Sequence, residues 1–215
     1  MGNIAPLSRD QRRTLARLNA FLRERGLYLA GGVAVAIHRR HRRSLDLDFF
    51  SLHAPLDLAS ARDALIAEQL PVDVISLTDA SLRLRIGQTP VDIVSYPYEL
   101  LVRPRPGPQG VLVASVRDLA TMKLAAVAQR GIYRDFWDLH ELLTGGVSLT
   151  RALADYATRF GAAKSDLYHL LRALTYFDDA ERVSTFPAGL TRRHWLEIRA
   201  WFEEHAAAAL RRLAR

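Results

Sequence analysis

Two aspartates, Asp46 and Asp48, interrupt the run SLDLDFF, whose leucine and phenylalanine residues otherwise give the pattern of a strand over 45–50. Residues two apart on a strand point to the same face, so both carboxylates are predicted to share one face, opposite Leu45, Leu47 and Phe49. Neighbouring carboxylates repel each other, and burial near a core penalises each of them further. A divalent cation with oxygen ligands, Mg²⁺ or Mn²⁺, would relieve both effects. A solvated edge strand is the alternative.

Two further features lie close to this strand in the sequence. Gly31 and Gly32 separate a predicted strand, 27–30, from a predicted helix, 33–40. Glycines at such a turn permit close backbone approach, and a helix N-terminus offers N–H groups to a phosphate. Asp92 is a third acid within an apolar strand, 91–95. Three such carboxylates are the ligands needed to hold two metal ions and activate a hydroxyl for attack on a phosphate.

The overall composition restricts the class of protein. The chain has 30 Lys and Arg against 23 Asp and Glu, a net charge of +7, which suits a polyanionic partner such as RNA. A coding bias towards arginine would give the same excess. The absence of cysteine excludes disulfides and thiolate metal sites. The longest apolar stretch, 27–37, is shorter than the ~20 residues that span a bilayer. We therefore expect a cytoplasmic protein without a membrane segment.

The texture of the chain changes near residue 110. Before it, helices are predicted over 8–25, 33–40 and 56–70, and strands over 27–30, 45–50, 72–77, 81–86 and 91–95. The proline- and glycine-rich segment 103–110 has the composition of a loop or linker. Beyond it, helices are predicted over 115–130, 134–144, 149–160, 164–177 and 191–213. The pattern predicts an α+β domain, 1–110, followed by a helical domain, 111–215.

Two segments together resemble a known family. YLAGGVAVAIHRRHRRSLDLDFF, residues 28–50, resembles the first motif of the polymerase β-type nucleotidyltransferases, and more narrowly that of the AbiEii/AbiGii (MenT-like) toxins. SVRDLATMKLAAVAQRGIYRDFWDLHELL, residues 115–143, resembles the second signature of those toxins: a lysine on a helix, then an arginine, then D-x-x-D-L. The resemblance implies a nucleotidyltransferase-type mixed sheet with flanking helices, followed by a helical C-terminal bundle.

The resemblance also implies roles for individual residues. Asp46, Asp48 and Asp92 would ligate the metal ions, with Asp92 as general base, and Gly31 and Gly32 would cradle the triphosphate. In the second segment, three further residues are implicated: Lys123 would neutralise the triphosphate, Asp135 would be the acid of the last motif, and Asp138 would support it. Lys123 is one of only two lysines in the chain. An ion pair with Arg130 or Arg134, within a helix or a loop, is the alternative account of Asp135.

Two positions complete the predicted nucleotide site. Arg130 lies seven residues after Lys123, on the same face of the predicted helix. Val33 stands where the family pattern often has a serine or threonine, so Ser44 is the nearest residue that could supply a hydroxyl to the phosphates. Because of this departure at Val33, a relative of the family with weakened or no catalytic activity is an alternative.

Other chemistry has weaker support. His38 and His41 have the spacing of a zinc-binding pair, but the four arginines around them oppose a divalent cation. The tryptophans, Trp137, Trp195 and Trp201, fit core positions better than platforms for stacking nucleobases.

The implied function is transfer of a nucleoside monophosphate from an NTP to a hydroxyl, with the tRNA 3′ end as acceptor and a cognate antitoxin as partner. Two alternatives remain: nucleotidyl transfer to a protein or a small molecule, and a nucleotide-binding relative with weak or no turnover.

Overall fold

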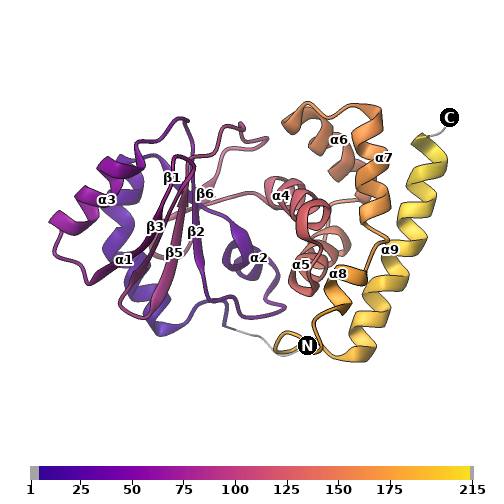
Figure 1. Cartoon of the computed structure of the whole chain (residues 1–215), viewed down its shortest axis with the longest axis horizontal. Coiled ribbons are helices and arrows are strands. Elements are labelled where there is room, and N and C mark those ends of the chain that lie inside the picture. The colour runs from indigo at the N-terminus through magenta and orange to yellow at the C-terminus, as the bar shows by residue number, and fades with distance from the viewer. Residues whose placement is uncertain (1–4, 214–215) are drawn as a thin grey trace. The chain divides into compact units, whose positions relative to one another are not determined.

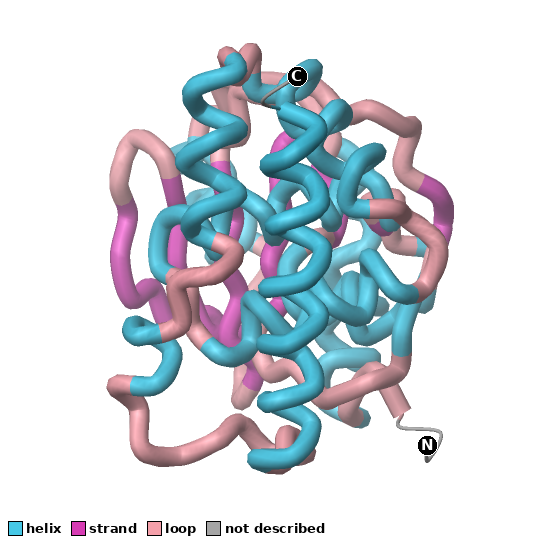
Figure 2. The backbone as a smooth tube through the Cα atoms, turned by 90° about the vertical axis from the view of Figure 1, so that its right-hand side faces the viewer, coloured by secondary structure: helices cyan, strands magenta, loops and turns pink. Residues whose placement is uncertain are grey.

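The computed structural model describes residues 5–213, and the ends of the two predicted domains, residues 1–4 and 214–215, lie outside the described residues. The chain divides into two compact units, one ending at Ser115 and the other starting at Val116. All strands of the described residues belong to the first unit, and residues 116–213 form only helices and loops; Figure 2 colours strands magenta and helices cyan. Within 5–213, no helix is long and apolar enough to cross a membrane.

The first unit is built on a mixed seven-stranded sheet in the order β3-β4-β5-β2-β1-β7-β6. Its elements are α1 (Arg9–Glu24), β1 (Leu27–Leu29), α2 (Gly31–Arg39), β2 (Leu47–Ser51), α3 (Leu58–Ala67), β3 (Val72–Leu77), β4 (Ser81–Ile86), β5 (Thr89–Val94), β6 (Arg105–Pro106), η1 (Pro108–Gly110) and β7 (Leu112–Val113). Figure 1 shows α1 and α3 on one side of the sheet and α2 on the other. The mixed sheet with flanking helices confirms the predicted fold class.

The capping residues of α1 also position the acidic segment. Ser8 accepts a hydrogen bond from the Gln11 backbone N–H, and the Gln11 side chain accepts one from the Ser8 N–H, which is a capping box. The Gln11 amide then donates to the carbonyls of Ser44 and Leu45, each at 2.9 Å. The helix start predicted from the sequence thereby anchors the segment that leads into β2.

The acidic strand starts later than predicted. β2 begins at Leu47, so Asp46 precedes it, and Leu45 is 70% exposed rather than on the buried face with Leu47 and Phe49. Alternation applies only where the ladder to β5 has formed, because the pleat is what fixes side-chain direction. The prediction for Leu45 was therefore wrong, whereas Leu47 and Phe49 are fully buried.

The segment 103–110 is more ordered than a linker. Arg105 and Pro106 pair with Val113 and Leu112 as an antiparallel edge of the sheet, and a 3₁₀ turn joins the two strands. Proline is tolerated in such an edge strand because its missing N–H need not pair. The sequence identified the turn residues but could not show that they add a hairpin to the sheet.

The second unit is helical, as predicted, although helix 164–177 ends at Ala173. Its elements are α4 (Val116–Arg130), α5 (Tyr133–Thr144), α6 (Leu149–Phe160), α7 (Lys164–Ala173), α8 (Asp178–Glu181) and α9 (Arg192–Leu213). Phe136 packs against Phe177, Trp195 and Phe202 with ring centroids 5.2–5.7 Å apart. Trp137 and Trp195 are buried and Trp201 is partly buried, which matches the predicted core positions.

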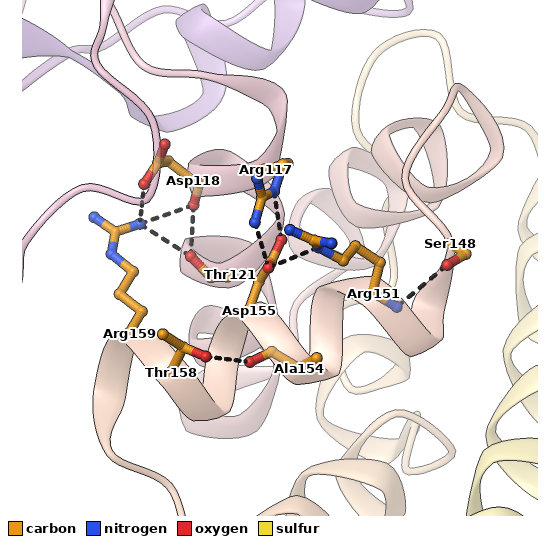
Figure 3. Close-up of polar contacts among 9 residues, drawn as sticks. All are labelled: Arg117, Asp118, Thr121, Ser148, Arg151, Ala154, Asp155, Thr158 and Arg159. Carbon is orange, nitrogen blue, oxygen red and sulfur yellow. Dashed lines mark hydrogen bonds and ion pairs between the residues drawn. The ribbon is translucent and has the colours of Figure 1, made fainter.

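Buried charges join α4 to α6 (Figure 3). The Arg159 guanidinium lies 3.3 Å from a carboxylate oxygen of Asp118 and donates to the Asp118 carbonyl and to the Thr121 hydroxyl. Nearby, Asp155 accepts from Arg117 at 2.7 and 2.6 Å and from Arg151 at 2.9 Å. The hydrogen bonds and then the charge of Arg117, with a smaller contribution from Arg151, outweigh burial and lower the pKa of Asp155.

We expect the substitution Arg159→Met to lower the free energy of unfolding by about 3–5 kcal/mol, because Asp118 stays buried without its guanidinium. Urea unfolding followed by tryptophan fluorescence measures this directly, since all three tryptophans belong to the second unit. Arg193→Met, which removes an exposed pair with Glu197, should change stability by less than about 0.5 kcal/mol. Equal effects of the two substitutions would contradict a structural role for the Arg159 network.

The lowered pKa of Asp155 predicts a dependence of stability on pH. The unfolded chain takes up a proton at Asp155 near pH 3.9, before the folded chain does. The stabilisation is therefore complete above about pH 5 and is lost as the pH falls through the lower folded-state pKa. The free energy of unfolding, measured with urea, should therefore differ less between pH 6 and pH 3 in Asp155→Asn than in the parent. Asp63→Asn, at an exposed site, should leave that difference as in the parent.

Candidate active site

The pairing of β2 with β5 brings two of the predicted acids together. In this parallel ladder Asp48 lies opposite Asp92, and the flanking pairs Leu47–Val91 and Phe49–Ile93 are fully buried on the other face. Aligned residues on neighbouring strands share a face, so both carboxylates lie on the side away from that core. Asp46, two residues before Asp48, is also partly exposed.

Arg83 on β4 was not predicted, and it joins the acidic group. It pairs with Asp92 in the β4–β5 ladder, and its Nε donates to Asp92 Oδ1 at 3.1 Å. That hydrogen bond, then the charge of Asp92, raises the pKa of Arg83, and the charges of Asp46 and Asp48 raise it further. All three carboxylates thus act electrostatically on one guanidinium. The alternation in SLRLRI placed Arg83 on a solvent face, but only the ladder register shows which residue it meets.

Gly31 lies directly against Asp48. It is the first residue of α2, with φ +61°, and a Cβ at this position would collide with the Asp48 carboxylate. The Ala30 N–H also donates to the Asp48 carbonyl at 2.8 Å. The sequence predicted a turn at Gly31-Gly32, whereas the structure places both glycines in the first turn of α2. The acid and the helix N-terminus are therefore neighbours.

Gly32 provides room for two polar side chains. A Cβ there would lie 2.5 Å from the Ser44 hydroxyl oxygen and 2.7 Å from Arg42 Nη2. The predicted hydroxyl source, Ser44, is thus beside the glycines, and Val33 is buried in the core. Arg42 is buried and is one of the four arginines that surround the histidine pair in the sequence. Its cation at a helix N-terminus favours an anion at this position.

The site residues predicted from the second segment form a buried network in the helical unit. Lys123 Nζ on α4 lies 3.0 Å from Asp135 and 2.8 Å from Asp138, both on α5. Arg130 donates to both oxygens of Asp135, at 2.7 and 3.0 Å. Both aspartates are fully buried, whereas the Arg130 side chain is 61% exposed. Asp135 and Asp138 are one helical turn apart, so both can reach the same ammonium.

Charge pairing determines the ionisation of this network. Burial opposes the charged form of Lys123, but the charges of Asp138 and Asp135 outweigh it and raise the lysine pKa. Burial likewise opposes ionisation of Asp135, yet the Arg130 hydrogen bond and the charge of Lys123 lower its pKa. An ion pair with Arg130 or Arg134 was the alternative role predicted for Asp135 from the sequence, and the pair with Arg130 is present. The Asp135 carboxylate of this pair is buried, whereas the Arg130 side chain is exposed. Two cations and two carboxylates leave the network without net charge.

The His38 side chain contacts the backbone of the first unit. His38 Nε2 lies 2.9 Å from the Ala114 carbonyl, which fixes that ring against the end of the sheet. By contrast, the carboxylates of the first unit are hard oxygen donors with partial exposure, as Mg²⁺ or Mn²⁺ requires. The donor chemistry of these residues therefore fits the divalent cations that the sequence implied, although Asp46, Asp48 and Asp92 do not form a group of described residues whose ligand atoms all lie within 4.8 Å of one another.

Known proteins resemble the chain in both sequence and fold. An uncharacterized protein of Aquifex aeolicus strain VF5 is 30% identical over 181 residues, covering 81% of this chain and 84% of the relative. The nucleotidyltransferase toxin MenT4 of Mycobacterium tuberculosis H37Rv superposes with a TM-score of 0.55 at 15% identity, covering 94% of this chain and 86% of the toxin. The antibiotic-resistance factor ANT(2″)-Ia also gives 0.55, at 17% identity, covering 76% of this chain and 97% of that protein.

The two similar structures, at 15% and 17% identity, establish only the fold. The family assignment rests on the sequence. The model of the nucleotidyl transferase AbiEii toxins, which belong to type IV toxin–antitoxin systems, matches residues 13–212. This range includes both the glycine and aspartate residues of the first unit and the buried lysine network of the second. The chain therefore belongs to the AbiEii nucleotidyl transferase toxin family and is a nucleotidyltransferase.

Proposed function

We propose that the protein transfers a nucleoside monophosphate from an NTP to the 3′ end of tRNA, with Mg²⁺ or Mn²⁺, as a cytoplasmic toxin held in check by a cognate antitoxin. The observation that carries the proposal is the contact of Gly31 with the Asp48 carboxylate, beside Asp92 in the next strand. Through this contact, a helix N-terminus that can bind phosphate lies next to a carboxylate that can bind a metal ion.

In the proposed reaction, the acceptor hydroxyl oxygen attacks the α-phosphorus of the NTP. The bond from the α-phosphorus to the bridging oxygen breaks, and pyrophosphate leaves with that oxygen. The hydroxyl proton passes to Asp92, which is 28% exposed and therefore reachable from solvent. When bound between Asp46, Asp48 and Asp92, divalent cations would neutralise the phosphates and make the hydroxyl more acidic.

The nucleotide would be held by groups around α2. Gly31 and Gly32 add no side chains of their own at the helix start, so their backbone N–H groups would face the phosphates, and the helix dipole would favour the negative charge. Ser44 and Arg42, both beside Gly32, would add a hydroxyl and a cation. Ser44 thus takes the place of the hydroxyl that Val33 lacks, which favours a competent site over a weakened one.

The network of the second unit would contribute through its exposed member. Lys123 is already neutralised by two carboxylates, so its contact with a triphosphate requires phosphate oxygens to replace a carboxylate. Arg130 reaches solvent while its guanidinium is held by Asp135. In this proposal Lys123 and Asp135 position the Arg130 guanidinium, and Arg130 is the member of the network that would bind a phosphate. The net charge of +7 favours a polyanionic acceptor.

Asp48→Asn is expected to reduce nucleotidyl transfer at least about 100-fold, because the amide keeps the shape but loses the charge that holds the cation. The assay incubates the protein with Mg²⁺, each labelled NTP in turn, and total tRNA or no acceptor. Asp79→Asn removes an exposed acid between β3 and β4 and should retain the parent rate.

The position of the label separates the alternatives. Label on RNA supports tRNA as acceptor, and label on the protein or on an added small molecule assigns the same chemistry to another acceptor. No label with any NTP, together with equal NTP binding by the parent and Asp48→Asn, would show that the chain binds nucleotides without transferring them.

Gly31→Ala should abolish transfer while the protein still folds, because the added Cβ displaces the Asp48 carboxylate. Gly87→Ala is the matched control. Gly87 has a similar φ of +57°, so alanine costs roughly the same 1–2 kcal/mol there, but its Cβ would meet no atom within 4 Å. Transfer rates and thermal melting of both variants test the prediction. Equal activity of the two variants would argue against the Gly31–Asp48 contact as part of the site.

A further inference from the structure

A second group of metal-binding side chains lies in the helical unit, built from α5 and α9. His140 and Glu141 come from the last turns of α5, and His194 comes from the first turn of α9. One ligand atom from each residue lies within 4.8 Å of the other two. In the sequence, His194 is more than fifty positions from the other two, so no motif spacing indicates the group.

The group is largely shielded from water. The side chains of His140 and Glu141 are 16% and 14% exposed, and His194 is also partly buried. Within residues 5–213, His140 Nδ1 is fully buried and has no hydrogen-bond partner, with the nearest Glu141 oxygen at 3.9 Å. A buried imidazole nitrogen without a partner is unfavourable unless a ligand satisfies it.

We propose that His140, Glu141 and His194 form a zinc site. Two imidazoles and one carboxylate are a common set of three zinc ligands, and a water molecule would complete the tetrahedron. Imidazole nitrogen also favours Zn²⁺ over Mg²⁺, which prefers oxygen ligands throughout. The site is thus chemically distinct from the carboxylates of the first unit, and it does not depend on the function proposed for them.

The surroundings of the group suit a bound metal. His194 packs edge-on against Trp137 at 5.6 Å, and His140 packs edge-on against Trp201 at 5.5 Å. Such an apolar shell limits water access and strengthens the attraction between metal and ligands. Zinc at this point would bind the end of α5 to the beginning of α9, so metal binding should stabilise the helical unit.

The experiment uses the full chain, treated with a chelator and then dialysed into excess Mg²⁺ so that oxygen-ligand sites are filled. Zn²⁺ is added and binding is measured by calorimetry, with melting followed by circular dichroism. Co²⁺ is the second probe. We expect one equivalent of Zn²⁺ to bind and raise the Tm, and Co²⁺ to quench tryptophan fluorescence in a saturable way, because Trp137 and Trp201 contact the ligand histidines.

His194→Gln and Glu141→Gln should each weaken Zn²⁺ binding more than about tenfold, since even changes around metal ligands cost about 10–100-fold. His169→Gln removes an exposed imidazole from α7 and should bind Zn²⁺ as the parent does. Asp48→Asn should also leave Zn²⁺ binding unchanged, which separates this site from the acidic one.

Three results would overturn the proposal: no saturable binding of Zn²⁺, equal binding by the parent and His194→Gln, or loss of binding in Asp48→Asn alone. Far-UV circular dichroism of each metal-free variant distinguishes loss of a ligand from loss of the fold. If His194→Gln does not fold, Glu141→Gln carries the same comparison.

Discussion

The parallel pairing of β2 with β5 is the constraint on which the acidic site depends. It sets Asp48 beside Asp92 and buries their apolar neighbours on the opposite face, so the backbones of the two acidic residues cannot move apart without breaking the central ladder of the sheet. Hydrophobic burial of the flanking residues therefore holds the two acidic residues side by side despite the repulsion between their like charges. Arg83 partly offsets that repulsion, and its contact with Asp92 is the kind that an arriving cation would compete with.

Buried charge is handled differently in the helical unit. There, each buried aspartate has a cationic partner within the same unit; Asp155, for example, binds two guanidiniums, and Asp135 binds an ammonium and a guanidinium. Such networks stabilise less than their contacts suggest, because desolvation offsets most of the attraction. They do specify helix packing, since any other arrangement leaves a charge buried alone. The lysine network joins α4 to α5 in this way whether or not it contacts a nucleotide.

Local patterns were sufficient where a residue interacts with its neighbours in sequence. The capping box at Ser8 fixed the start of α1, and the alternation of 72–77 and 81–86 gave β3 and β4 with their observed bounds. Predictions failed where the outcome depended on distant pairing. Leu45 alternates with its neighbours but has no partner in the β2 ladder, and it is exposed. The proline-rich segment 103–110 is ordered because its residues Arg105 and Pro106 pair with β7.

The sequence by itself determined the chemistry that the chain carries: three acids in or next to apolar strands, a glycine pair at the start of a helix, and a rare lysine followed by D-x-x-D-L. These features depend only on residue type and on short spacings along the chain, so they can be recognised in the sequence alone. Only the tertiary structure decided the partners: Gly31 against Asp48, Arg83 on Asp92, and two histidines from separate helices beside Glu141. Such contacts follow from strand register and helix packing, which are set by burial of the whole core and leave no periodic signal in the sequence.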